Sequence, residues 1–159
     1  MKKLILLFGL LSILAAVGCK SKKNAAPPKP VVAKTTKIAP EKVDQAQKTK
    51  AYELGKRVLM TCNTSRFRPF STAEATPEVI KNTTQERLTK TCNNFRLKYG
   101  AFKDIYFIEA IRNRTNKTNV YRFKADYEKK IANKELRVIM NEDNQVAGIK
   151  SLDWKDVYK

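Results

Sequence analysis

Three cysteines, Cys19, Cys62 and Cys92, are the residues of this chain whose type could support chemistry. A cysteine thiolate can ligate a metal, act as a nucleophile or oxidise to a disulfide. The chain contains no histidine, so the commonest general base and metal ligand is missing, together with the Cys-His and Ser-His nucleophile pairs. Two cysteines without further ligands do not make a zinc site. We therefore expect no metal ion and no cofactor, and we interpret the cysteines as sites of covalent modification.

If Cys19 serves another purpose, Cys62 and Cys92 are the two cysteines left to pair with each other. In an oxidising compartment such a pair predicts a disulfide. Closing a loop of about 30 residues would stabilise the fold by about 3–4 kcal/mol through the lost entropy of the unfolded chain. The alternative is two separate buried thiols, because cysteine often serves as a small apolar core residue.

The first 19 residues indicate where the protein is located. Lys2 and Lys3 precede the uncharged apolar run 4–17, which is shorter than the ~20 residues that a membrane-spanning helix needs. Cationic residues followed by a short apolar run and small residues predict a secretory signal peptide. The run ends Ala16-Val17-Gly18-Cys19, and this ending resembles the bacterial lipobox.

The lipobox resemblance implies that residues 1–18 are removed and that Cys19 is diacylated as the mature N-terminus. It further implies a lipid-anchored protein of the bacterial cell envelope. Lys20 follows the cysteine in place of an aspartate, and by the sorting rule of enteric bacteria this favours the outer membrane. The alternative is an ordinary signal peptide that happens to end near a cysteine.

Residues 19–47 have the composition of a disordered tether, with four prolines, many lysines and no aromatic residue. Such a segment has little apolar surface to bury. The net charge of +18 would favour nucleic acid as a partner in a cytosolic protein, but an exported chain meets a membrane surface instead. We expect Lys20, Lys22 and Lys23 to contact anionic lipid headgroups beside the anchor. Alternatively, these lysines only keep the tether extended and soluble.

The folded domain is expected to span residues 48–159 and to begin with three helices. Apolar residues recur on one helical face between Tyr52 and Cys62. Thr76-Pro77-Glu78 is typical of a helix start, with a capping hydroxyl, a proline at the first helical position and an acid in the first turn.

The third helix is predicted by a capping box made of Thr83 and Glu86, and Gly100 can end it. One apolar stripe follows along this helix, and it comprises Leu88, Cys92, Phe95 and Tyr99. Cys62 ends the first helix and Cys92 lies within this stripe, so both cysteines can face the same interhelical seam.

From Phe102 the apolar period changes to two, which predicts strands. Four are expected, separated by polar turns, over residues 102–111, 121–128, 135–140 and 146–152. The order of helices first and strands second predicts an α+β fold. In this fold three N-terminal helices pack on a curved four-stranded antiparallel meander.

Two short phrases carry a resemblance to a known fold family. An amphipathic helix ends Asn93-Asn94-Phe95-Arg96-Leu97-Lys98-Tyr99-Gly100 and runs directly into Ala101-Phe102-Lys103. The last hairpin, residues 136–149, ends in a hydrophobic–Ala–Gly–hydrophobic step. Together with the element order, these phrases resemble the nuclear-transport-factor-2-like fold, in a bacterial branch of small exported domains of unknown function. The resemblance implies a cone-like domain with a cavity, in a family of isomerases, dehydratases and members that only bind or scaffold.

The enzymes of that family place acidic or histidine residues in the cone. Here Glu109 is the most suggestive carboxylate, because it interrupts an otherwise apolar strand face, and Asp126 is a second candidate. A carboxyl group buried in the cavity would have a raised pKa and could act as a base. The alternative is that Glu109 pairs with a cation across the sheet, and the available cations are Arg112, Arg122 and Lys124.

Four aromatic residues, Tyr106, Tyr121, Phe123 and Tyr127, lie on the same two expected strands as Glu109. They are candidates to line the cavity with Glu109 and contact a ligand, although such aromatics also form sheet cores. The sequence favours a non-catalytic envelope lipoprotein that binds a small apolar ligand, a protein partner or a second copy of itself as a homodimer. The alternatives are an isomerase-like or hydratase-like enzyme with Glu109 as base, and a basic module that clamps an anionic envelope polymer.

Overall fold

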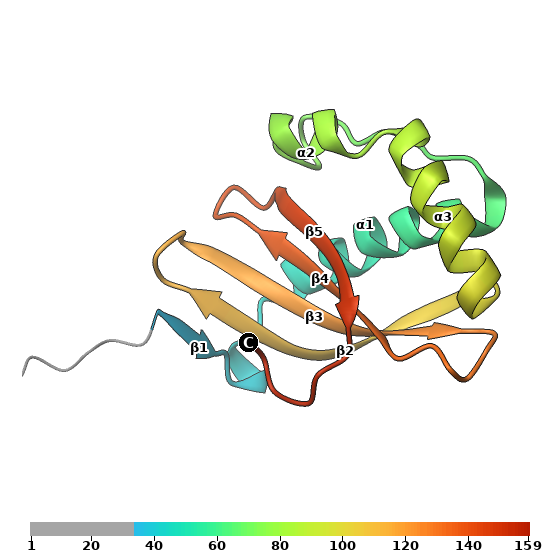
Figure 1. The fold of residues 1–159 in the computed structure, drawn as a ribbon. Coiled ribbons are helices and arrows are strands. Elements are labelled where there is room, and N and C mark those ends of the chain that lie inside the picture. The colour runs from blue at the N-terminus through green and yellow to red at the C-terminus, as the bar shows by residue number, and fades with distance from the viewer. Residues whose placement is uncertain (1–33) are drawn as a thin grey trace, which may run out of the picture. The chain divides into compact units, whose positions relative to one another are not determined.

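The computed structural model describes residues 34–159, which form an α+β domain with one antiparallel sheet (Figure 1). Five strands follow one another in space in the order of the chain. They are β1 (Thr35–Lys37), β2 (Phe102–Asn113), β3 (Thr118–Tyr127), β4 (Lys134–Met140) and β5 (Val146–Asp153). The helices are α1 (Gln45–Thr64), α2 (Pro77–Asn82) and α3 (Gln85–Tyr99), with a 3₁₀ turn η1 (Pro40–Lys42) before them.

The expected α+β class, the three helices and the antiparallel meander are present, but the sheet has five strands and not four. The additional strand, β1, pairs antiparallel with the far end of β2, where Thr35 lies opposite Asn113 and Lys37 opposite Ile111. Residues 35–47, which we expected in the tether, therefore carry a strand, a 3₁₀ turn and the start of α1. The signal peptide 1–18, Cys19 and the lysines 20, 22 and 23 lie outside the described residues.

The helix boundaries follow from capping residues. The Asp44 carboxylate accepts a hydrogen bond from the Gln47 backbone N–H at 2.9 Å and begins α1. Pro77 stands at the start of α2 as expected. The cap of α3 is Thr84, whose hydroxyl accepts from Arg87 N–H at 3.4 Å. The expected capping box of Thr83 and Glu86 is therefore wrong, because Thr83 ends α2 and the third residue after the cap is Arg87. Gly100 ends α3 with a φ of 78°, a conformation that suits glycine.

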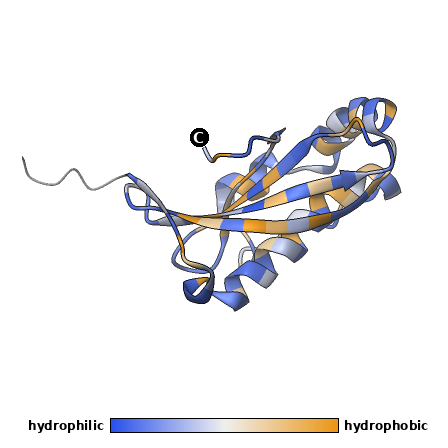
Figure 2. Ribbon diagram, turned by 90° about the horizontal axis from the view of Figure 1, so that it is seen from below, coloured by the Kyte–Doolittle hydropathy of each residue, from blue (hydrophilic) through white to orange (hydrophobic). Residues whose placement is uncertain are grey.

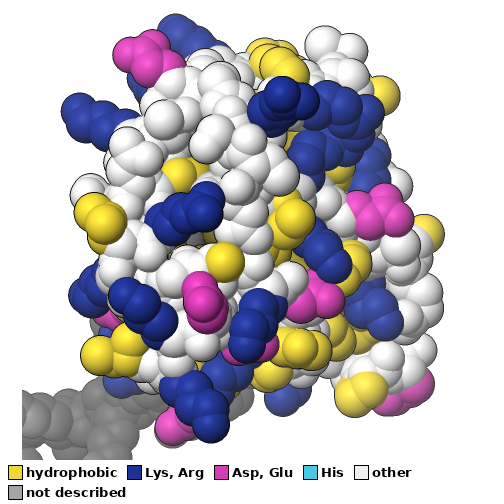
Figure 3. Space-filling model, turned by 90° about the vertical axis from the view of Figure 1, so that its right-hand side faces the viewer, with side chains coloured by type: hydrophobic (Ala, Val, Ile, Leu, Met, Phe, Trp, Pro, Cys, Tyr) yellow, Lys and Arg dark blue, Asp and Glu magenta, His cyan; other side chains and the backbone are white. Residues whose placement is uncertain are grey.

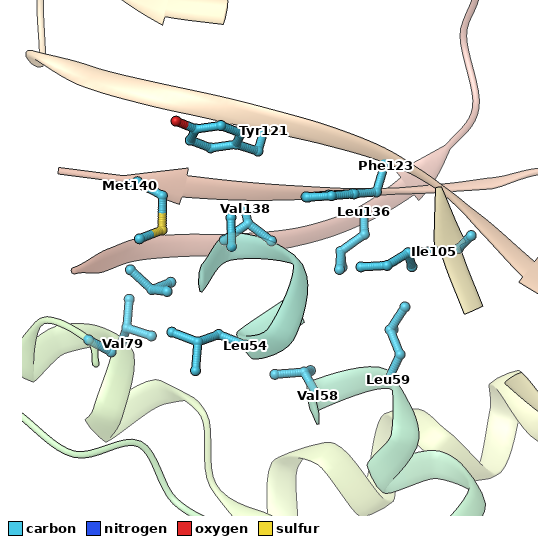
Figure 4. Close-up of a cluster of buried hydrophobic side chains, with 14 of the residues drawn as sticks. Leu54, Val58, Leu59, Val79, Ile105, Tyr121, Phe123, Leu136, Val138 and Met140 are labelled. Carbon is cyan, nitrogen blue, oxygen red and sulfur yellow. The ribbon is translucent and has the colours of Figure 1, made fainter. Parts of the chain in front are cut away.

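Helix α1 packs against one face of the sheet and forms the core with it (Figure 4). Leu54 and Val58 of α1 lie against side chains of β2, β3 and β4. Gly55 permits the close approach, because a Cβ atom built there would lie 2.7 Å from Leu136 Cδ2 and 2.9 Å from Val138 Cγ2. Helix α3 packs chiefly against α1.

The two faces of the sheet differ, and hydrophobic and hydrophilic residues alternate along its strands (Figure 2). On β3, Tyr121, Phe123 and Tyr127 are buried in the core on the helix side, and Arg122 and Lys124 point to the other face, which we call the tail face. The C-terminal residues 154–159 contact this face through Arg122 and Arg137. No helix within residues 34–159 has the length and apolar character needed to cross a membrane.

Candidate ligand-binding site

The Cys62–Cys92 disulfide is present and joins the last turn of α1 to the middle of α3. It connects residues 30 positions apart in the sequence, as the pairing of the two cysteines predicts. The predicted seam between the first and third helices is confirmed by this bond. The disulfide holds α3 against the flank of α1, beside the sheet rather than centrally on it.

An apolar pocket of about 200 Å³ lies between α1, α3 and the last two strands, and we call it the α3 groove. Both cysteines of the disulfide line it. Its polar contributors are Thr91 of α3 and Ser151 of β5. The remaining lining residues are Val58, Leu59, Leu88, Phe95, Leu136 and Ile149. Aliphatic and aromatic side chains around a small opening favour an apolar ligand, because they offer no partner for a polar group.

The five residues expected to line one cavity are divided between the two faces of the sheet, and none of them lines the α3 groove. Tyr121, Phe123 and Tyr127 belong to the core on the helix side. The Tyr121 hydroxyl donates to Gln47 Oε1 at 2.9 Å. Tyr106 and Glu109 lie on the tail face, where Tyr106 is exposed and pairs in register with Lys124.

Glu109 forms two ion pairs. One is with Arg122, which was among the three cations expected, and the other is with Lys37 of β1, whose Nζ lies 2.9 Å from Glu109 Oε2. Partial burial alone would raise the pKa of Glu109, but the hydrogen bonds and positive charges of Lys37 and Arg122 outweigh it and lower this pKa. Glu109 therefore stays ionised and is a weak proton acceptor.

The other expected candidates around Glu109 have different partners. The Arg112 guanidinium binds the Glu142 carboxylate at 2.6 Å, and Lys124 lies over the Trp154 ring, 5.1 Å from its centroid. Asp126 lies on the tail face, opposite Asp104 in the register of β2 and β3.

A second, more polar pocket beside Glu109 has a volume of about 390 Å³. It is lined by Thr35, Lys37, Glu109, Ile111, Asp156, Val157 and Tyr158.

A buried ionic cluster on the tail face is a feature that the sequence analysis did not find. Arg122 and Glu135 have no exposed side-chain area, and they form an ion pair between β3 and β4. Arg137 binds the same Glu135 carboxylate. The C-terminal segment covers them, because the Trp154 ring lies 4.9 Å from the Arg122 guanidinium and Lys155 O accepts from Arg122 at 2.6 Å. Alternation along single strands could not show this cluster, because its burial by the C-terminal segment is a long-range contact.

Within residues 34–159 no three histidine, cysteine, aspartate or glutamate side chains gather as a metal site would require. The chain matches no protein-family model, and no curated protein or solved structure is significantly similar to it.

Proposed function

We propose that this protein is a lipoprotein of the bacterial cell envelope, anchored through Cys19 in the outer membrane, with a non-catalytic domain that binds a small apolar ligand. We further propose that the domain is a variant of the nuclear-transport-factor-2-like fold. The observation that carries the ligand proposal is the α3 groove, an apolar pocket whose wall includes the disulfide.

The size of the groove sets the kind of ligand. Pockets for whole small molecules commonly measure about 300–1,000 Å³, and the α3 groove measures about 200 Å³. It therefore suits one aromatic ring or a short alkyl segment, with the rest of a longer ligand left outside. The disulfide supports binding because it holds α3 beside the opening and reduces the ordering cost that a ligand would otherwise meet.

Two features support a binding domain over an isomerase-like or hydratase-like enzyme. The pKa of Glu109 is lowered by its two cations, so this carboxylate has little tendency to take a proton from a substrate. A tyrosine hydroxyl could serve as the proton donor beside such a base, but the hydroxyl of Tyr121 lies on the opposite face of the sheet from Glu109 and binds Gln47. Burial, with a smaller contribution from Asp44, raises the pKa of Tyr121 to about 12.

The ligand proposal is tested by titrating the protein with benzene and n-hexane and following its methyl NMR signals. We expect the methyl groups of Leu88, Leu136 and Ile149 to shift, because they line the groove. Thr91→Phe fills the groove from α3 and should abolish the shifts. Asn94→Phe places the same ring on an exposed position of α3 and should leave them intact. Equal shifts in both variants, or none in the parent protein, would contradict the proposal.

A second candidate function, association with a protein partner or a second copy, is favoured by the edge of β2. Strand β1 pairs with β2 only from Ile111 to Asn113, and on the rest of β2 three consecutive apolar residues, Tyr106, Phe107 and Ile108, are exposed. An apolar sheet edge is a template for another strand. If this edge mediates a homodimer, Ile108→Lys should yield monomers in analytical ultracentrifugation. Val157→Lys, the same substitution at another exposed apolar residue, is the control and should leave the dimer intact.

A further inference from the structure

One end of the domain combines exposed apolar side chains with positive charge. It consists of residues 96–98 in the last turn of α3 and residues 128–131 in the loop between β3 and β4, and we call it the basic tip. Leu97 is 78% exposed and Ile131 is 73% exposed. They are the two most exposed large apolar side chains among residues 34–159.

The two segments of the basic tip are held together by hydrogen bonds. Lys129 Nζ donates to the Leu97 carbonyl oxygen at 2.9 Å. The Lys129 backbone N–H donates to Tyr99 O at 3.0 Å, and the Glu128 backbone N–H donates to Ala101 O at 2.8 Å. The helix end that carries Leu97 and the loop that carries Ile131 are therefore braced against each other.

The charge of the basic tip is strongly one-sided. It holds four cations, Arg96, Lys98, Lys129 and Lys130, and one acid, Glu128. None of these four cations forms an ion pair with another residue between 34 and 159. The Glu128 carboxylate accepts from the Ala101 backbone N–H at 3.2 Å. Figure 3 shows the side of the domain on which α3 lies, where Lys and Arg side chains are numerous and hydrophobic side chains lie between them.

We propose that the basic tip binds the surface of an anionic lipid bilayer, with Leu97 and Ile131 entering the headgroup region and the four cations contacting lipid phosphates. Cations surrounding protruding aliphatic side chains suit such an interface, because the charges meet anionic headgroups while the apolar groups leave water. A soluble polyanion would engage the cations alone and would leave Leu97 and Ile131 in water.

The position of the basic tip allows contact with a membrane while the chain is tethered. It lies at the Phe102 end of β2, and β1 lies at the Asn113 end of the same strand (Figure 1). Twelve residues separate these ends, or about 40 Å at ~3.4 Å per residue. A chain anchored at Cys19 has about 15 residues before β1, and these can extend up to about 50 Å. The tip can thus reach the bilayer that holds the anchor.

The test uses tryptophan as a depth probe in the full-length protein, added to vesicles that contain brominated lipid quenchers. Ile131→Trp reports on the tip. Val157→Trp is the matched control, because Val157 is also exposed and lies beside Thr35 of β1 at the other end of the sheet. The parent protein, whose single tryptophan is Trp154, supplies the background.

In vesicles containing phosphatidylglycerol we expect the Ile131→Trp emission to shift to the blue and to be quenched, and the Val157→Trp emission to do neither. Phosphatidylcholine vesicles should leave both unquenched. Lys98→Gln with Lys130→Gln leaves the Lys129 brace in place. This double variant should raise the lipid concentration needed for half-maximal quenching about tenfold or more, since each lysine near an anionic surface contributes to binding, and high salt should act in the same direction.

Equal quenching of the two tryptophans in anionic vesicles would overturn the proposal. So would quenching of Ile131→Trp that is the same in neutral vesicles. Binding of soluble polyphosphate that depends on Lys98 and Lys130, without quenching by either vesicle, would overturn it as well and assign the tip to a soluble polyanion.

Discussion

Arg122 and Glu135 form an ion pair across neighbouring strands with both side chains removed from solvent. Arg122 Nε lies 3.1 Å from the same Glu135 oxygen that its terminal nitrogen contacts. Glu109 and Arg137 bind the outer sides of the pair, and Trp154 covers it. Burying two charges costs solvation energy, and good geometry with further hydrogen bonds is needed to offset that cost.

Removing one partner of this pair should be strongly destabilising. We expect Arg122→Met to lower the free energy of unfolding by about 3–5 kcal/mol, because Glu135 would stay buried with only Arg137 beside it. Urea unfolding followed by circular dichroism measures this. Arg68→Met is the control, since Arg68 is 71% exposed in its ion pair with Glu74 and its loss should cost less than about 1 kcal/mol. A similar small cost for both variants would contradict the buried-pair interpretation.

The disulfide should contribute to stability through the unfolded chain. Replacing both Cys62 and Cys92 by alanine opens a loop of 30 residues, and we expect a loss of about 3–4 kcal/mol in unfolding free energy. A reductant should lower the melting temperature of the parent protein and leave the double variant unchanged. Non-reducing peptide mapping of protein isolated from the envelope should show the two peptides linked, and free thiols on both residues would refute the bond.

Glu74 should make the domain sensitive to acid. Hydrogen bonds from Arg57, outweighing partial burial and aided by the Ser71 N–H, lower the pKa of Glu74 from 4.5 to about 2. A group with a depressed folded-state pKa stabilises the fold above its unfolded pKa, and this contribution is lost as the pH falls from about 4.5 through about 2.

Glu74→Gln should therefore destabilise the domain by about 1–3 kcal/mol at pH 7, and the difference from the parent protein should shrink toward zero near pH 2. Unfolding free energies measured across this pH range check the prediction. Glu53→Gln, at an exposed position of α1, is the control. Its unfolding free energy should differ from that of the parent protein by the same small amount at every pH. A Glu74→Gln difference that does not depend on pH would show that the ion pair with Arg57 is not the cause.

Glu109→Gln should leave the biological role of the protein largely intact. Lys37 is 65% exposed in its pair with Glu109, and Arg122 keeps its bond to Glu135, so we expect a stability change of no more than about 1–2 kcal/mol. A complementation assay comparing this variant with a gene deletion measures the role. A stably folded Glu109→Gln protein that behaves like the deletion would favour the enzyme alternative.

Lipidation can be tested separately from the fold. Cys19→Ala should release the protein from membranes washed with high salt, which screens the contact of the basic tip, without unfolding the domain, because the modified residue lies well before β1 in the chain. Cell fractionation and mass spectrometry of the N-terminus provide the measurement. An unmodified N-terminus in membrane-extracted protein, or salt-resistant membrane association that does not depend on Cys19, would contradict the lipid anchor.

The helices and the four main strands could be predicted because their signals are local. The apolar stripe of α3, the proline at the start of α2 and the alternation along β3 each lie within one element. Strand β1 could not be predicted, since its three residues, Thr35 to Lys37, carry no periodic pattern. It forms because the edge of β2 is available, and that is a long-range contact.

The position of Glu109 shows why the candidate site could not be assembled from alternation alone. A strict period of two puts Glu109 on the same face as Ile105 and Phe107. A register shift between Phe107 and Glu109 inserts one extra residue into β2 and exchanges the faces. Phe107 consequently pairs with Phe123 on the core side, and Glu109 pairs with Arg122 on the tail face.

Strand β1 also determines how mechanical force would enter the domain. It is the first element after residue 34, so drag on a membrane-anchored molecule would pull on β1 before any other part. Strand β1 is held along the edge of β2 by the paired residues from Thr35–Asn113 to Lys37–Ile111. The Arg114 backbone N–H adds a hydrogen bond to Lys34 O. A pull along the strand axis loads these bonds together in shear instead of opening them one at a time. The hydrogen bonds between β1 and β2 would therefore carry the force first, before it reaches the helices that line the α3 groove.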